Sequence, residues 1–229
     1  YEICACLVGS EMCIRDSGVV ARSVFSHLVG SDSYIFDDFT KKQLDTFTRV
    51  AAELEAGLEY KVIKHILNSA GIERFTDYQM DMVRLGIGLY GVSASGQKGL
   101  RNISTLKTTI LQIQNVPAGD SIGYSRMSYV KRDSRIAIIP IGYADGLDRH
   151  FSNGGGEVVI NGHRCPIIGN ICMDACMIDV TDTDAHEGDS VIIFGEELPV
   201  SELSDKLKTI PYEILTSISP RVKRVYYRE

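Results

Sequence analysis

The sequence predicts two structural classes in one chain: a parallel α/β part followed by an all-β part. Two observations lead to this prediction. Up to about residue 91, apolar runs with the length of strands alternate with stretches that have the period of a helix. Beyond it, short β-branched runs are separated by Gly, Asn, Asp and Pro turn signals. A chain of 229 residues is long enough to bury a core in each part.

The first part is expected to form strands and helices in alternation. We expect strands at 19–28, 60–67 and 82–90, and helical segments at 39–56 and 72–78. This order is typical of parallel α/β structure with its active face at the carboxyl ends of the strands, although three strands are too few to close a barrel. The apolar residues expected on one side of the longer helix are Phe39, Leu44, Phe47, Val50, Ala51 and Leu54.

A stretch rich in Gly, Ser and charge at 93–102 marks the expected boundary, with one domain at 18–95 and a β domain at 96–229. One late helix is expected at 200–207, with Ser201 as its N-cap. The Asn161-Gly162 pair predicts a hairpin whose return strand starts late, near Pro166. The strands expected in the β domain are 105–114, 134–141, 157–160, 167–180, 191–194 and 222–227.

Residues 1–17 are expected not to belong to the fold. They have no clean period, and the run LVGSEMCIRDS resembles a translated sequencing-adapter artefact found at the ends of metagenomic reading frames. On this hypothesis the natural sequence begins near Gly18, and its true upstream part is missing.

Composition excludes several classes of function. A net charge of -6, with no Lys and Arg runs interleaved with aromatics, argues against nucleic-acid binding. No apolar segment approaches the roughly 20 residues that span a bilayer, and no basic region precedes an apolar one at the N-terminus, so we expect a cytoplasmic protein without a membrane partner. Cys172 and Cys176 share a face of one expected strand and could be half a metal site. No second pair with His has ligand spacing, so we expect buried thiols and no metal.

Two small-residue turns in the first part are candidate anion sites. NSAG, at 68–71, and RLGIG, at 84–88, offer backbone N–H groups that an anion can approach closely. Ser69 could add a hydroxyl or serve as an N-cap. Arg84 is expected to need a partner or a ligand, and His65 is a candidate partner. The alternative for His27 and His65 is a satisfied histidine in the core.

The stretch 139–180 presents candidate site residues at the ends of two apolar runs. Tyr143, Asp145 and Arg149 follow the first run, and Met173 and Asp174 lie within the second. Tyr124 and Tyr212 have similar apolar-to-turn settings. A tyrosine acts as a general base only when positive charge lowers its pKa from about 10.

These motifs, taken in order, resemble the alanine racemase family of pyridoxal-phosphate enzymes. The resemblance covers the chain from about Val19 to its end, and GYADG with ICMD is its most specific part. It implies the last strands of an incomplete TIM-type (β/α) barrel followed by a complete C-terminal β domain. It also implies a homodimer with shared active sites that interconverts L- and D-alanine for peptidoglycan synthesis, with pyridoxal 5'-phosphate as cofactor. The strings that carry it are FSHLVGSD, HILNSAG, DMVRLGIGLYG, PAGDSIGYSR, IPIGYADGLDR, GNICMDACMIDV and PYEILTSISPRVKRVY.

The resemblance also implies a role for each site residue. Tyr124 would be the catalytic base on the L-alanine side, acting in the partner subunit's site. Arg84 would face the pyridine nitrogen with His65 behind it, and His27 would lie near the cofactor ring. The phosphate would be held by Ser69, Gly86, Ile87 and Tyr212, with Asn68 beside them. Met173, Asp174 and Tyr143 would bind the substrate, and Arg149 would line its approach.

Two departures from the family pattern bear on activity. Asn170 stands where many members have Arg in GRICMD. The strand with the Schiff-base lysine and Ala-Tyr-Gly, and the Arg that grips the substrate carboxylate, are missing, so we expect this chain alone to be inactive. Three alternatives remain: a broad-specificity amino-acid racemase, a decarboxylase of the same architecture, against which GYADG and ICMD argue, and a non-catalytic interaction module.

Overall fold

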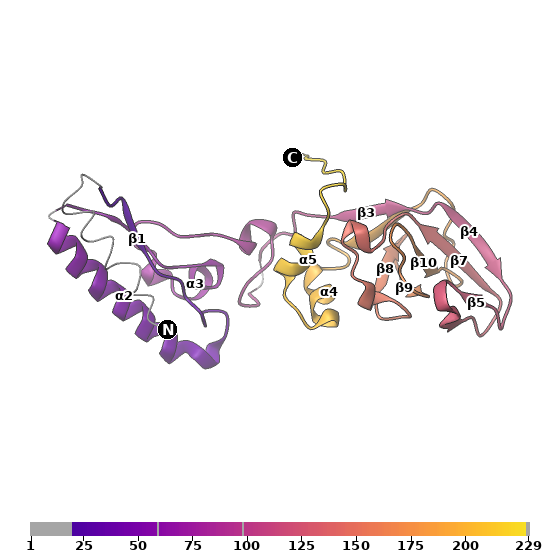
Figure 1. The fold of residues 1–229 in the computed structure, drawn as a ribbon, viewed down its shortest axis with the longest axis horizontal. Helices are drawn as coiled ribbons and strands as arrows, with labels where there is room; N and C mark the ends of the chain where they lie inside the picture. The colour runs from indigo at the N-terminus through magenta and orange to yellow at the C-terminus, as the bar shows by residue number, and fades with distance from the viewer. Residues whose placement is uncertain (1–19, 59, 98, 228–229) are drawn as a thin grey trace. The chain divides into compact units, whose positions relative to one another are not determined.

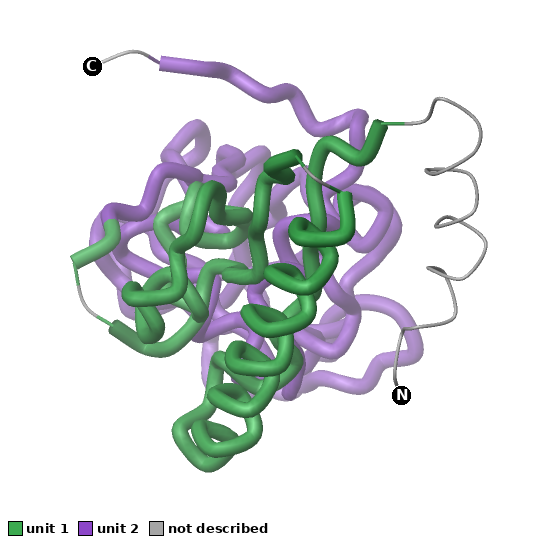
Figure 2. Tube along the Cα trace, turned by 90° about the vertical axis from the view of Figure 1, so that its left-hand side faces the viewer, with its two compact units in different colours: residues 1–100 green, residues 101–229 purple. Residues whose placement is uncertain are grey.

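The computed structural model describes residues 20–227 except 59 and 98 (Figure 1). The chain divides into two compact units, residues 1–100 and residues 101–229, which Figure 2 shows in green and purple. The expected artefactual stretch at 1–17 lies outside the described residues.

Unit 1 contains a two-stranded parallel sheet and one long helix. Strands β1 (Ser23–Phe25) and β2 (Ile63–His65) pair so that Phe25 lies opposite His65. Helix α2 (Asp37–Leu58) begins with two acidic residues, which favour the positive end of the helix dipole. The predicted helix is confirmed, but its apolar face is narrower than expected, because Phe39 and Val50 are 52% and 39% exposed. The hydrophobic core of this unit joins α2 to the segments that follow β1 and β2, and it comprises Leu28, Leu44, Phe47, Ala51, Ile66, Leu67 and Phe75.

The prediction of a third strand at 82–90 is wrong. The backbone N–H groups of Asp81 and Arg84 donate to the carbonyls of Lys64 and Leu67, at 3.2 and 2.9 Å, so the segment runs beside β2 without a regular ladder. It then turns into the 3-10 helix η3 (Ile87–Tyr90). The reason is its glycines: Gly86 is neither helical nor extended at φ -108° and ψ -102°, and Gly91 ends η3 in the left-handed region.

The short helical segment expected at 72–78 begins earlier than predicted. Helix α3 (Ser69–Arg74) is followed by the 3-10 helix η2 (Thr76–Tyr78), and a further 3-10 helix, η1 (Tyr34–Phe36), precedes α2. The N-cap of α3 is Asn68, whose side-chain oxygen accepts from the N–H of Gly71 at 3.0 Å. This side-chain cap starts the helix at Ser69.

Unit 2 is built on a seven-stranded antiparallel sheet with the order β3-β11-β8-β9-β10-β7-β4. A two-stranded hairpin, β5 (Ser121–Ile122) and β6 (Ser128–Tyr129), lies outside this sheet. The sheet strands are β3 (Leu106–Thr109), β4 (Gln112–Val116), β7 (Ser134–Ile139), β8 (Glu157–Ile160), β9 (His163–Ile168), β10 (Cys176–Asp179) and β11 (Ser190–Phe194).

Two of the predicted strands are each divided in two. The strand expected at 105–114 becomes β3 and β4 because the chain changes partners: β3 pairs with β11, whereas β4 pairs with β7. The run expected at 167–180 is interrupted by a loop between Ile168 and Cys176. The hairpin at Asn161-Gly162 is confirmed, with both φ values positive at 48° and 78°. Its return strand does not start late, because His163 already pairs with Ile160.

The end of the chain is partly as predicted. Helix α4 (Val200–Leu207) has the expected bounds, but Pro199 is its N-cap and no side chain caps it, so Ser201 does not have the expected role. A second helix, α5 (Pro211–Ser217), was not expected. The prediction of a strand at 222–227 is wrong, since these residues have no strand structure.

The prediction that Cys172 and Cys176 share one strand is wrong. Cys172 lies in the loop and Cys176 in β10, and burial raises the pKa of the Cys176 thiol to about 12. Cys165 is also buried, and its pKa is raised to about 11. Among the described residues, no group of three or more His, Cys, Asp or Glu is arranged to hold a metal ion. No described helix combines the length and the apolar character that a membrane crossing needs.

Candidate functional site

One group of candidate residues lies in unit 1, where the two small-residue turns meet. The hydroxyl oxygen of Ser69 is buried and accepts from the backbone N–H of Gly86 at 2.9 Å and of Gly88 at 3.5 Å. Ile87, between them, is 3% exposed. Ser69, Gly86 and Ile87 are therefore brought together as predicted from the sequence, whereas Asn68 is used within the fold, since its side chain also bonds Ser31 and the carbonyl of Leu28.

Arg84 lies beside this turn with part of its guanidinium unpaired. Its Nη2 donates to the carbonyl of Ile66 at 3.0 Å and to that of Ser26. The guanidinium carbon is 5.2 Å from the centroid of the Phe25 ring. Its Nε is buried and has no hydrogen-bond partner among the described residues. A buried donor without a partner costs free energy, so this atom calls for an acceptor.

His65 is buried next to Arg84, and His27 is not buried. The ring of His65 stacks on Phe25 at a centroid distance of 5.2 Å, and its Nδ1 has no partner in the described part of the chain. Burial, and then the charge of Arg84, lower the pKa of His65 below its ordinary 6.5, so the imidazole is neutral at pH 7. His27 is exposed, which rules out the alternative of a core histidine for this residue.

A second group lines an open hollow of about 710 Å³ in unit 2. Five of the seven candidate residues of this unit line it, on three short 3-10 helices and one loop, and Asp145 is not among them. Tyr124 begins η4 (Tyr124–Arg126), Tyr143 begins η5 (Tyr143–Asp145), and Arg149 begins η6 (Arg149–Phe151). Met173 and Asp174 lie on the loop before β10. Tyr212, on α5, is not among the residues that line this hollow.

Gly142 allows two walls of the hollow, the η5 segment and the loop before β10, to pack with their backbones in direct contact. The N–H groups of Tyr143 and Ala144 donate to the carbonyls of Cys172 and Met173, each at 3.1 Å. A Cβ at Gly142 would lie 2.3 Å from the carbonyl oxygen of Cys172 and 2.4 Å from that of Met173. The glycine of GYADG is therefore required by this close approach to ICMD.

Arg221 joins the same two walls, and sequence reasoning missed it. Its Nε donates to Asp145 at 2.7 Å and its Nη2 to Asp174 at 2.6 Å. Burial alone would raise the pKa of Asp145, but the hydrogen bonds from Arg221 and the Gly142 N–H, with the charge of Arg221, lower it. No spacing signal connects Arg221 with an acidic residue 76 positions earlier.

The fold and the site together define a class: a two-domain protein in which an α/β unit with a candidate anion turn precedes a β domain with a tyrosine-lined hollow. Two family models match the chain. The model described as alanine racemase, N-terminal domain, matches residues 11–94, and that described as alanine racemase, C-terminal domain, matches residues 103–226. The chain belongs to the alanine racemase family.

Curated relatives and solved structures agree with this assignment. The chain is 40% identical to alanine racemase 1 of Caldanaerobacter subterraneus over 219 residues, which cover 92% of this chain and 56% of the relative. It is similar to the crystal structure of alanine racemase from Bartonella henselae with covalently bound pyridoxal phosphate, with a TM-score of 0.85, 35% identity, and coverage of 97% of this chain and 61% of that one. For the racemase of Streptomyces lavendulae the TM-score is 0.88 at 32% identity, covering 98% of this chain and 61% of that one. The chain thus spans little more than half the length of the relatives that it matches.

Proposed function

We propose that this chain serves the interconversion of L- and D-alanine with pyridoxal 5'-phosphate, as a part of an alanine racemase. The observation that carries the proposal is the hollow in unit 2, where Tyr124, Tyr143 and Met173 meet, in a chain of this family. The hydroxyl of Tyr124, which can exchange a proton, the cation of Arg149 and the half-exposed Met173 suit a small amino acid.

The residues of unit 1 fit the cofactor. Pyridoxal phosphate offers a pyridine nitrogen that accepts a hydrogen bond, and the buried Nε of Arg84 is a donor without a partner among the described residues. The hydroxyl oxygen of Ser69 accepts from the N–H groups of Gly86 and Gly88, so the hydroxyl proton of Ser69, which has no acceptor among the described residues, suits a phosphate group. When bound, the cofactor stabilises the negative charge that develops on the α-carbon of the substrate.

The roles of the chain's own residues follow from these positions. Arg84 cannot readily give up a proton, so a pyridine nitrogen in front of it would stay unprotonated and the electron sink would be weak. This favours return of the proton over side reactions. The neutral His65 packs behind Arg84 without adding charge. Tyr124 removes or returns the α-proton on the L side, and the backbone at Met173 binds the substrate carboxylate with Asp174 beside it.

We further propose a cytoplasmic homodimer in which Tyr124, Tyr143 and Met173 act in the partner's site. The exposure of these three side chains, at 72%, 45% and 54%, supports an assembly that covers them. Analytical ultracentrifugation of the complete enzyme tests the proposed dimer. We expect the mass of a dimer, and the mass of a monomer would contradict the proposal.

The test of the proposed function supplies the missing lysine. The part of the Caldanaerobacter relative that this chain does not match is fused to residues 18–229, and formation of D-alanine from L-alanine is measured with added pyridoxal phosphate. We expect activity in the fusion and none in the 229-residue chain alone. Activity of the chain alone would refute the expected need for the lysine.

Two other results would reject the proposed reaction. A folded fusion that binds the cofactor and only decarboxylates amino acids would reject it, and so would one that has no activity. Assays with serine, lysine and arginine separate a broad-specificity racemase from one that is specific for alanine.

A further inference from the structure

The position of Tyr124 depends on its backbone. The side chain is 72% exposed, and its hydroxyl has no hydrogen-bond partner within the described part of the chain. It belongs to a turn at residues 123–127, which we name the tyrosine turn. Gly123, Ser125 and Arg126 all have positive φ, at 72°, 64° and 51°. Residues other than glycine rarely adopt a positive φ, so contacts outside the turn must hold this backbone conformation.

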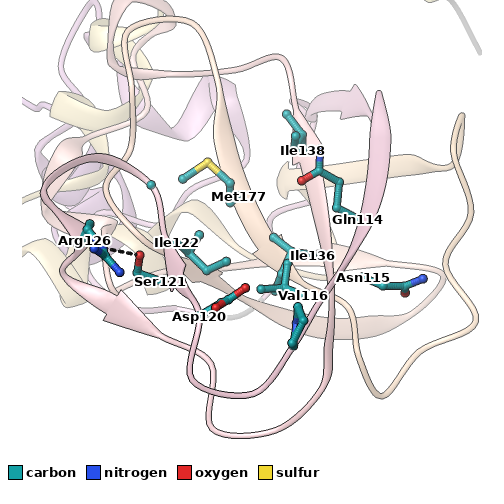
Figure 3. Close-up of a pocket in the computed structure, with 12 residues that line it drawn as sticks. Gln114, Asn115, Val116, Asp120, Ser121, Ile122, Arg126, Ile136, Ile138 and Met177 are labelled. Atoms are coloured by element: carbon teal, nitrogen blue, oxygen red, sulfur yellow. Dashed lines mark hydrogen bonds between the residues drawn. The ribbon is translucent and has the colours of Figure 1, made fainter.

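The tyrosine turn separates two hollows of unit 2. Tyr124 lines the hollow of the candidate site, whereas Gly123 and Arg126 line a second hollow with Gln114, Asp120 and Met177 (Figure 3). On the side of the second hollow, Arg126 donates from Nε to the Ser121 hydroxyl at 2.9 Å (Figure 3). That bond is exposed and links the turn only to the strand next to it.

On the side of the candidate site, the turn is held by Asn170. The side-chain amide of Asn170, a residue that is 9% exposed, donates to the carbonyl of Tyr124 at 3.0 Å across 46 positions. Its oxygen accepts from the amide of Asn153 at 3.0 Å, and the oxygen of Asn153 accepts from the Ser128 hydroxyl at 2.7 Å. Ser128 in turn accepts from the N–H of Gly169 at 3.1 Å. The hydrogen bonds of this relay therefore all run in one direction, from the N–H of Gly169 through Ser128, Asn153 and Asn170 to the carbonyl of Tyr124.

We propose that Asn170 is a positioning residue: with Asn153 and Ser128 it holds the tyrosine turn in the conformation that presents Tyr124 to the hollow. Asn170 lies three residues before Met173 on the same loop, so the relay fixes the tyrosine relative to the loop that bears the other site residues. The residue must both donate and accept, as an amide does. An Arg at this position could donate to the carbonyl of Tyr124 but could not accept from Asn153.

The catalytic meaning of this role rests on the proposed function, but its test needs neither cofactor nor substrate. The chain has no Trp, so Tyr124→Trp introduces a single fluorescent reporter at the tip of the turn. In that background, Asn170→Asp removes the donor and places a carboxylate oxygen against the Tyr124 carbonyl. Asn153→Asp breaks the relay one bond further away. The matched control is Asn102→Asp, which removes the same kind of amide-to-carbonyl bond, of 2.9 Å, at an exposed site of the same unit.

We expect Asn170→Asp and Asn153→Asp to lower the fluorescence anisotropy and to increase quenching by acrylamide, with an unchanged far-UV spectrum. Asn102→Asp should change neither. Unchanged anisotropy in both relay variants would overturn the proposal, and so would an equal loss in the control. A larger loss with Arg126→Met than with the relay variants would assign the positioning to Arg126 instead. If Asn170→Asp fails to fold, Asn153→Asp decides alone. Absence of racemisation in the fusion would reject the proposed function and leave this result standing.

Discussion

Replacing Gly142 by Ala tests whether the two walls of the hollow are held together at their backbones. The new methyl group would lie 2.3 to 2.5 Å from three backbone atoms of Cys172 and Met173, and none of them is the movable end of a side chain. The walls must separate by several tenths of an ångström, which breaks the two hydrogen bonds from Tyr143 and Ala144. Each bond contributes about 1 kcal/mol net. Overpacking adds roughly 1–3 kcal/mol, so we expect unit 2 to lose roughly 3–5 kcal/mol.

Urea denaturation followed by circular dichroism measures this loss. With a slope of roughly 1.5 kcal/mol per M, the midpoint of unit 2 should fall by about 2–3 M. Gly57→Ala is the control, because it makes the same exchange in unit 1, where the methyl group meets nothing within 4 Å, and should leave the midpoint of unit 2 unchanged. A Gly142→Ala midpoint equal to that of the control would show that the walls can separate freely, and the close-approach argument would be refuted.

Three further predictions concern charge and burial. Arg221→Met should cost about 1 kcal/mol at pH 7. Since Arg221 helps to lower the pKa of Asp145, stability from Asp145 is present above its unfolded value of 3.8 and is lost as pH falls through the folded pKa; Arg221→Met should move that loss to higher pH in acid titrations of stability. For the buried neutral His65, stability should fall as pH drops below 6.5, and His65→Gln should remove this dependence from thermal melts taken between pH 5 and 7. Ser69→Ala should leave the N–H groups of Gly86 and Gly88 unpaired and lower unit 1 stability by roughly 1–2 kcal/mol in urea titrations, whereas Ser23→Ala, at an exposed residue of the same unit, serves as the neutral control.

The sequence was most informative where backbone chemistry is local. Asn161-Gly162 specifies a hairpin turn through its two positive φ values, and GYADG places small residues where two loops meet. Neither feature depends on a distant side chain. The hollow in unit 2 could therefore be anticipated from short strings.

Other features depend on competing local preferences, or on distant contacts, that a short sequence segment does not reveal. The run at 82–90 is as apolar as a strand, but Gly86 and Gly91 turn it away from a ladder. Helix α5 contains β-branched residues that favour strands, and only Pro211 at its first turn indicated a helix. The ion pairs of Arg221 and the relay through Asn170 join positions far apart in sequence, and only the folded chain brings them together.

The assignment of Tyr124 as the base on the L side is tested most directly by isotope exchange. In the fusion, Tyr124→Phe removes the hydroxyl at a side chain that is 72% exposed, and Tyr129→Phe makes the same change at a neighbouring tyrosine that does not line the hollow. Exchange of the α-proton with deuterated water is followed by NMR for each enantiomer. We expect Tyr124→Phe to slow exchange from L-alanine by about 10²- to 10⁴-fold while exchange from D-alanine continues. Tyr129→Phe should have no effect on either enantiomer. Rapid exchange from L-alanine in Tyr124→Phe, or an equal loss for both enantiomers, would contradict the assignment.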